Sequence, residues 1–194
     1  MKNIISKIAL KLFPQPSLRE EIADRVMRLT SYYKIENGDY LEFGVHLGKS
    51  FVASYKAAQR YGLKDMKFYA FDSFAGLPDV KGIDEVGSQF RRGDYACTEE
   101  QFKKNLQAKG VNLNKVVTVP GWYDNTLSNE TKKKLPLKAA AVVWIDCDLY
   151  ESTVPVLNFL TDYIVDGTIL VFDDWFCFRG SPERGEQKIG RAHV

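Results

Sequence analysis

Acidic residues follow two apolar stretches in the second half of the chain, and their positions indicate a cation site. Asp146 and Asp148 come directly after the run AAVVWI, and Asp173 and Asp174 come directly after TILVF. Such runs are typical of parallel strands that are covered on both faces and whose carboxyl ends meet at one edge of the sheet. Carboxylates that lie so close together repel one another unless they are protonated or share a cation. Mg²⁺ prefers oxygen ligands of this kind. We therefore expect Asp146, Asp173 and Asp174 to hold Mg²⁺. Any one of them could equally cap a helix or turn, but the set of three favours a metal.

A second chemical signal is the glycine-bearing stretch GVHLGKS, from Gly44 to Ser50, between a predicted strand and a predicted helix. Glycines leave room for a ligand near the backbone, and a helix N-terminus offers free N–H groups. The Gly-x-x-x-Gly spacing matches neither the GxGxxG dinucleotide fingerprint nor the full phosphate-loop pattern. Asp72 ends the next predicted strand, where an acid can accept hydrogen bonds from ribose hydroxyls. Together these features predict a nucleoside-binding half-site, in which we interpret His46 as a loop-packing residue rather than a base.

The elements that must position these residues alternate between strands and helices. Apolar runs predict strands over residues 40–45, 67–71, 116–119, 140–145 and 168–172. Apolar residues at helical spacing, with Ser17 and Thr98 as N-caps, predict helices over residues 17–35, 49–61 and 98–109, and a further helix after the acidic turn. This alternation predicts an α/β fold with a mostly parallel sheet. The irregular, polar residues 73–95 form a long loop of the kind that commonly serves as a lid or binding loop.

The composition is that of an ordinary globular domain, and it excludes several classes of function. The 194 residues are 45% hydrophobic and 27% charged, with a net charge of +2. No basic run with interleaved aromatics indicates nucleic acid, and no apolar run is long enough to span a membrane. Three widely spaced cysteines without a CxxC motif predict reduced thiols and a cytoplasmic protein. We expect residues 1–37 to form a helical segment whose first part packs on the domain, with contact to a membrane surface or a partner as the alternative. The sequence leaves a homo-oligomer open.

Several stretches together resemble one family. They are YLEFGVHLGKS, FYAFDSFAGLPD, GDYACTEEQFKKNL, VPGWYDNTL, IDCDLYEST and the FDDW that ends the last predicted strand. In order and spacing they are similar to the macrocin O-methyltransferases (TylF/MycF type), a family of class I S-adenosylmethionine-dependent methyltransferases. The resemblance spans residues 38–187. It implies a Rossmann-like three-layer sandwich and metal-dependent methylation of a hydroxyl on a sugar or sugar-bearing metabolite.

The resemblance also implies roles for individual residues. Glu42, Gly44, Gly48 and Ser50 match the loop that binds S-adenosylmethionine. Asp72, with its neighbour Ser73, matches the acid that binds the ribose of the donor. Gly121, Trp122 and Tyr123 match the residues beside the adenine, and Asp146 also matches the donor site. Asp146, Asp173 and Asp174 match the Mg²⁺ ligands, with Asp148 as an outer or alternative ligand. Mg²⁺ bound to acceptor hydroxyls would lower their pKa and fix their approach to the methyl group, which makes Asp146 the expected catalytic residue.

Two other functions fit parts of the pattern. A nicotinamide-dependent oxidoreductase also uses a glycine loop followed by an acid, but it gives no role to Asp173 and Asp174. A non-catalytic module of a glycan assembly system would bind neither S-adenosylmethionine nor metal.

The chain departs from the family pattern at its end. The family continues through further strands that carry acceptor contacts and a histidine base, whereas this sequence ends in IGRAHV, residues 189–194. One back-translation of these six residues matches the start of a common sequencing-library adapter. We therefore expect a methyltransferase domain over residues 38–188 that lacks the last strands, followed by a non-native tail.

Overall fold

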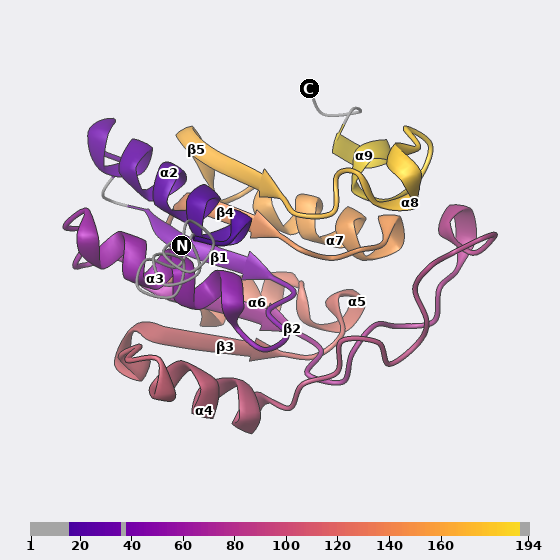
Figure 1. Cartoon of the computed structure of the whole chain (residues 1–194), viewed down its shortest axis with the longest axis horizontal. Helices are drawn as coiled ribbons and strands as arrows, with labels where there is room; N and C mark the ends of the chain where they lie inside the picture. Colours follow the sequence, from indigo (N-terminus) through magenta and orange to yellow (C-terminus); the bar gives the residue numbers. More distant parts are fainter. Residues whose placement is uncertain (1–15, 36–37, 191–194) are drawn as a thin grey trace, which may run out of the picture.

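The computed structural model describes residues 16–35 and 38–190 and contains a five-stranded parallel sheet (Figure 1). The strand order is β3-β2-β1-β4-β5, and each neighbouring pair is parallel. The strands are β1 (Asp39–Phe43), β2 (Phe68–Asp72), β3 (Val116–Pro120), β4 (Ala140–Ile145) and β5 (Ile164–Phe172). The predicted α/β architecture is therefore confirmed, and the carboxyl ends of all five strands lie along one edge.

Helices cover both faces of the sheet and produce two separate cores. Tyr40 and Trp144 point into the first core, where α2, α3 and α4 contribute most of the helical side chains. Leu41 and Ile145, one residue further along the same strands, point into the second core with α7. This alternation explains why β4 is apolar throughout, since neither of its faces reaches water.

The helices agree with most of the sequence predictions. They are α2 (Leu18–Tyr32), α3 (Lys49–Arg60), α4 (Glu99–Ala108), α5 (Tyr123–Thr126), α6 (Asn129–Lys134), α7 (Tyr150–Leu160), α8 (Cys177–Gly180) and α9 (Gly185–Gly190), with 3₁₀ turns η1 (Gly82–Asp84) and η2 (Leu113–Lys115). Ser17 and Thr98 cap α2 and α4 as predicted, and Ser17 forms a full capping box with Glu20.

The main departures from prediction have simple physical causes. Strand β5 begins at Ile164, four residues before the predicted start, because Ile164 already pairs with Ala140 of β4 although residues 164–167 are exposed. The register then shifts, and regular pairing resumes between Val142 and Ile169. The short helices α5 and α6 were not predicted, since neither is long enough to show an apolar periodicity.

The predicted N-terminal segment and tail are only partly described. Helix α2 confirms a helix in the former, and its Ala23, Val26 and Met27 are buried in the first core. Residues 1–15, 36–37 and 191–194 lie outside the described part of the chain. Of the predicted tail, Ile189 belongs to α9 and is buried in the second core.

None of the helices within residues 16–35 and 38–190 is both long enough and apolar enough to cross a lipid bilayer.

The long loop over residues 73–95 is attached to the helices that follow β4 and β5. Asp84 is fully buried, and its carboxylate accepts hydrogen bonds from the backbone N–H of Tyr150 at 2.6 Å and of Gly185 at 2.9 Å. The Arg184 guanidinium donates to the carbonyl oxygen of Val86 at 2.5 Å. Because Asp84 joins the first residues of α7 and α9, this part of the loop is a fixed wall rather than a free lid.

Gly44 connects the end of β1 to the end of β4 by close packing. It has a φ of 84°, and a Cβ atom placed on it would lie 1.9 Å from the carbonyl oxygen of Asp146. The sequence suggested that this glycine leaves room for a ligand, but at the Cβ position the space is filled by the protein's own backbone. Gly44 therefore fixes the distance between the glycine loop and the acidic residues.

Replacing Gly44 by alanine should lower the free energy of unfolding by roughly 3 kcal/mol or more, because the new Cβ forces the two strand ends apart. Gly62 is the matched control, since it has a φ of 78° but nothing within 4 Å of an added Cβ. Gly62→Ala should cost only about 1 kcal/mol, the price of the left-handed backbone. Urea denaturation of both variants measures the difference, and equal losses would contradict this role of Gly44.

Candidate functional site

A cavity of about 720 Å³ opens at the carboxyl ends of the strands. This is where open α/β sheets bind ligands, and the volume is typical of small-molecule sites. Among the sequence-predicted residues, those that line the cavity are Gly44, His46, Ser50, Asp72, Ser73, Gly121, Trp122, Tyr123, Asp146, Asp148 and Asp174. Glu42, Gly48 and Asp173 are not part of the lining. The two chemical signals in the sequence therefore meet at one cavity.

Asp72 organises the loops on the β2 side of the cavity. One oxygen of its carboxylate accepts hydrogen bonds from the backbone N–H of Val45 at 2.7 Å and of His46 at 3.2 Å. The other oxygen accepts from the N–H of Phe74 at 2.7 Å. A carboxylate has about four acceptor sites, so Asp72 can hold the glycine loop and still accept one hydrogen bond from a ligand.

Glu42 lies beneath the glycine loop and does not reach the cavity itself. It is fully buried and accepts hydrogen bonds from the hydroxyl of Ser50 at 2.6 Å and from the hydroxyl of Tyr40. Burial raises the pKa of Glu42 to about 8, against the lowering effect of the two hydroxyl donors. Glu42 therefore acts on the cavity through Ser50, which is buried, lines the cavity and donates its hydroxyl to Glu42.

The space beside Gly48 is also filled by the protein's own side chains. A Cβ atom placed on it would lie 3.0 Å from side-chain atoms of Phe102 and Leu106. This glycine lets α4 pack against the start of α3.

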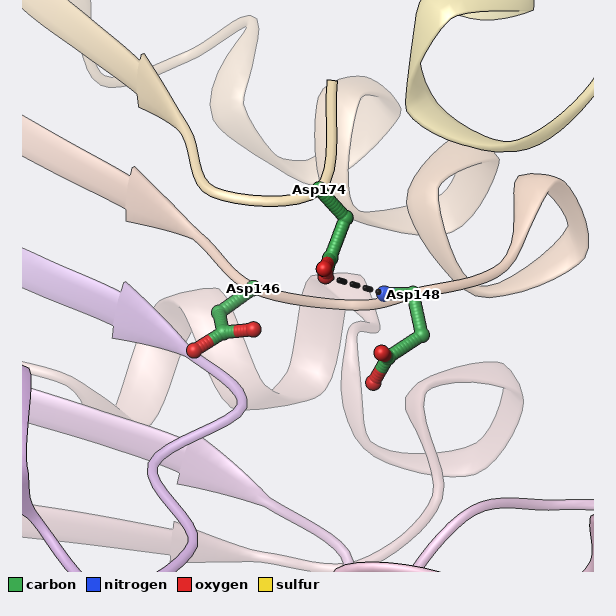
Figure 2. Close-up of side chains that lie close together, drawn as sticks. All are labelled: Asp146, Asp148 and Asp174. Carbon is green, nitrogen blue, oxygen red and sulfur yellow. Dashed lines mark hydrogen bonds between the residues drawn. The ribbon is translucent and has the colours of Figure 1, made fainter. Parts of the chain in front are cut away.

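Three carboxylates converge where β4 and β5 end. Asp146 and Asp148 follow β4, Asp174 follows β5, and one carboxylate oxygen from each lies within 4.8 Å of the others (Figure 2). Asp174 also accepts a hydrogen bond from the backbone N–H of Asp148 at 3.1 Å. We call these three residues the acidic cluster. Oxygen-only donors at this spacing suit a hard divalent cation.

The acidic cluster is electrostatically unfavourable without a cation. Burial, and then the charges of Asp174, Asp173 and other neighbours, raise the pKa of Asp146 well above its ordinary value. The same causes, burial first, raise the pKa of Asp148 to about 8. A bound cation would offset both effects.

Asp173 belongs to a different set of contacts from the one expected. The sequence grouped it with Asp146 and Asp174, whereas in the structure its carboxylate accepts a hydrogen bond from the guanidinium of Arg19. Arg19 Nη2 also lies 3.8 Å from an oxygen of Asp146. Asp148, expected as an outer or alternative ligand, lies within the cluster, and the ligand role of Asp173 stays a prediction.

Glu186 connects the loop after β4 to the loop after β5 through hydrogen bonds. It is fully buried, and its two carboxylate oxygens accept from the backbone N–H of Cys147 at 3.2 Å and of Asp174 at 3.0 Å. These amides lie next to or within the acidic cluster, so Glu186 sets the spacing between the ends of β4 and β5.

Sequence reasoning missed Arg19, Asp84 and Glu186. Each contacts partners more than 38 residues away in the chain, and none belongs to a local pattern that marks such a contact. The apolar spacing that predicted α2 was the one signal available for Arg19, and it says nothing of what the first turn touches.

A sequence model of the macrocin O-methyltransferase (TylF) family matches residues 23–186. The chain belongs to this family. The match extends from the middle of α2 to Glu186 and includes the glycine loop, Asp72 and the whole acidic cluster.

Curated O-methyltransferases are similar to the chain over 71% of its length. The 8-demethyl-8-(2,3-dimethoxy-alpha-L-rhamnosyl)-tetracenomycin-C 4'-O-methyltransferase of Streptomyces olivaceus is 31% identical over 144 residues, which cover 71% of this chain and 53% of that protein. The demethyldecarbamoylnovobiocin O-methyltransferase of Streptomyces niveus is 29% identical over 143 residues, with the same coverage. The chain spans about half the length of the curated relatives it matches.

Solved structures confirm the Rossmann-like fold of class I methyltransferases. The O-methyltransferase NovP superimposes with a TM-score of 0.72 at 25% identity, over 91% of this chain and 72% of NovP. The calicheamicin methyltransferase CalS11 superimposes with a TM-score of 0.76 at 24% identity, over 100% of this chain and 76% of CalS11.

The buried Glu42 should make stability depend on pH. Its pKa of about 8 in the folded protein exceeds its ordinary value of 4.5, so the folded state binds more protons between these values. The free energy of unfolding then falls as pH rises from about 4.5 to 8, by up to roughly 5 kcal/mol for this group. Glu42→Gln removes this contribution, and urea denaturation in EDTA at pH 5.5 and 8.5 should show a smaller loss than in the wild type.

The control for this test is Glu100→Gln, which changes an exposed glutamate of α4 that is paired with Lys104. It should retain the wild-type pH dependence. An unchanged pH dependence in Glu42→Gln would mean that Glu42 is ionised in the folded protein.

Proposed function

We propose that this chain carries the donor and metal sites of an S-adenosylmethionine-dependent, Mg²⁺-dependent O-methyltransferase that acts on a hydroxyl of a sugar or sugar-bearing metabolite. The observation that carries the proposal is the acidic cluster at the wall of a cavity that the glycine loop also lines. Family membership and the sugar-linked names of the relatives support the reaction and the acceptor class.

The donor is assigned to the part of the cavity between the glycine loop and Trp122. Asp72 retains capacity for a ribose hydroxyl, Ser73 and Gly121 lie beside it, and the Trp122 ring offers a flat apolar surface for adenine. Ser50 offers its backbone at the start of α3, where the hydrogen bond to Glu42 fixes its side chain. These residues would hold S-adenosylmethionine with its methyl group toward Asp146.

The metal is assigned to Asp146, Asp148 and Asp174. Their spacing fits a divalent cation, and Asp173, a ligand expected from the family resemblance, remains part of the proposed site although Arg19 pairs with it in this structure. Mg²⁺ held there would supply an electrophile that lowers the pKa of an acceptor hydroxyl and orients it. Asp146 lies in both the cavity lining and the cluster, so we assign it the catalytic role of placing the acceptor beside the donor.

The cytoplasm is the proposed compartment. Cys97, Cys147 and Cys177 are all free thiols, as in proteins of a reducing compartment.

The donor assignment predicts that the chain binds S-adenosylhomocysteine with micromolar affinity and does not bind NAD. Asp72→Asn should weaken this binding roughly tenfold or more, because the amide offers one acceptor oxygen where the carboxylate offers two. Asp79→Asn is the control, since Asp79 lines the same cavity but is exposed and paired with Arg92. Calorimetric titration measures all three proteins. Heat with NAD and none with S-adenosylhomocysteine would contradict the assignment and support an oxidoreductase.

The metal assignment predicts that Asp148→Asn weakens Mg²⁺ binding by at least roughly tenfold, because one charged ligand is lost. Asparagine suits the test, since Asp148 has a φ of 61° and asparagine tolerates this left-handed backbone. Asp124→Asn, which removes an exposed carboxylate from the same cavity outside the cluster, should leave the affinity unchanged. Equal affinity in both variants, measured by calorimetry with MgCl₂, would exclude Asp148 as a ligand.

A further inference from the structure

Tyr95, at the end of the long loop, is an aromatic residue of the cavity to which the proposed donor and metal sites give no role. Trp122 is assigned to the adenine, and Tyr123 donates its hydroxyl to the carbonyl oxygen of Phe71 at 3.2 Å. Tyr95 also lines the cavity, and it is 53% exposed. A half-exposed aromatic side chain at the wall of a cavity offers a large contact area to a ligand.

The backbone on both sides of Tyr95 is held by the fold. Before it, the N–H of Leu77 donates to the carbonyl oxygen of Asp94, and the N–H of Gly93 donates to the carbonyl oxygen of Leu77, both at 2.9 Å. After it, Thr98 caps α4. The ring is therefore positioned before any ligand binds.

Tyr95 has a left-handed backbone conformation, with a φ of 60°. This conformation costs free energy in residues other than glycine. Two more residues that line the cavity share it, since His46 has a φ of 42° and Asp148 has a φ of 61°. Residues in such conformations cluster at functional sites, where the surrounding structure maintains them. The shared conformation supports a ligand-binding role for Tyr95.

The Tyr95 ring lies between the glycine loop and the acidic cluster. Its centroid is 5.6 Å from that of the His46 ring in the glycine loop, in an edge-to-face contact. Partial burial, and then the charges of Asp148 and Asp174, raise the pKa of Tyr95 above its ordinary value, so its hydroxyl lies within electrostatic range of both carboxylates. A ligand packed on this ring would lie beside the proposed donor site and the proposed metal site.

A sugar ring has the two kinds of surface that this part of the cavity offers. Its C–H groups form an apolar face that packs on a flat aromatic ring, and its hydroxyls point outward from the edge. With the apolar face on Tyr95, a hydroxyl at the edge can reach a cation held by the acidic cluster.

We propose that Tyr95 forms the acceptor subsite, in which a sugar ring packs on the tyrosine ring and is thereby oriented with a hydroxyl toward the acidic cluster. The inference rests on the proposed function. It deepens that function by naming the residue of the long loop that binds the sugar of the acceptor.

Three variants test the contribution of the ring. Tyr95→Asn removes the ring and tolerates the left-handed backbone, and it should weaken the binding of a sugar roughly tenfold. Tyr95→Phe keeps the ring and should bind within about twofold of the wild type. Tyr33→Asn is the control, since it removes an exposed tyrosine at the end of α2, outside the cavity, and it should match the wild type.

The experiment titrates each protein, saturated with S-adenosylhomocysteine and Mg²⁺, with the methyl glycosides of glucose, galactose, mannose and rhamnose. Ligand-observed NMR measures the affinities, because it detects the weak binding of small probes. Equal affinity of all the proteins for S-adenosylhomocysteine shows that the variants are folded.

A second measurement on the wild type does not depend on how the variants fold. The ring ¹H–¹³C signals of Tyr95, assigned by their absence in Tyr95→Phe, should shift when a glycoside binds. Unchanged ring signals would overturn the proposal, as would wild-type affinity in Tyr95→Asn or a tenfold loss in Tyr95→Phe.

The same titrations separate this inference from the proposed function. A wild-type protein that binds S-adenosylhomocysteine and Mg²⁺ but none of the glycosides would overturn the acceptor subsite alone. A wild-type protein that binds neither S-adenosylhomocysteine nor Mg²⁺ would overturn the proposed function and this inference together.

Discussion

The parallel pairing of β4 and β5 forces like charges together, and much of the site's architecture offsets this repulsion. Ile145 pairs with Phe172, so the residues that follow the two strands emerge side by side. Asp146, Asp148, Asp173 and Asp174 therefore share one partly buried edge, where ionised carboxylates are costly unless they are paired or hydrogen-bonded. Arg19 offsets part of this cost from α2, and backbone N–H groups offset part of it within the loops.

Two buried acids, Glu186 and Asp84, hold the loops around the acidic cluster. Glu186 binds two amides in the loops after β4 and β5, and Asp84 binds the first amides of α7 and α9. Because α9 begins at Gly185, Asp84 holds the residue next to Glu186 in this short helix. The long loop, α9 and the acidic cluster thus form one connected network, so the cavity wall and the acidic cluster are positioned together.

The donor side of the cavity depends on the acidic side through Gly44. Its close packing against the backbone of Asp146 fixes the glycine loop relative to the cluster, and Asp72 fixes the same loop to the end of β2. The proposed methyl transfer would require donor and acceptor in a narrow range of geometries. A loop held at both ends by backbone contacts supplies such a fixed distance without relying on the ligand.

Local patterns predicted the elements of the fold, whereas contacts between distant segments were not predictable. The buried runs of β1 and β4 and the capping box of α2 carry their signals within a few residues. The exposed start of β5 and the short helix α5 carry no such signal, because their positions are set by backbone pairing and by the neighbouring elements. The site was predictable where strand ends bring residues together, as for Asp146 and Asp174. The ion pair of Asp173 with Arg19 was not predictable, since Arg19 lies 154 residues away from Asp173 in the chain.

The most direct test of the central claim is a crystal structure of the chain grown with S-adenosylhomocysteine and Mn²⁺, examined for anomalous scattering. The account predicts one manganese peak among the carboxylates of Asp146, Asp148 and Asp174, with S-adenosylhomocysteine in the adjoining cavity of about 720 Å³ and its sulfur directed toward Asp146. A manganese peak elsewhere, or a ligand bound outside that cavity, would contradict it.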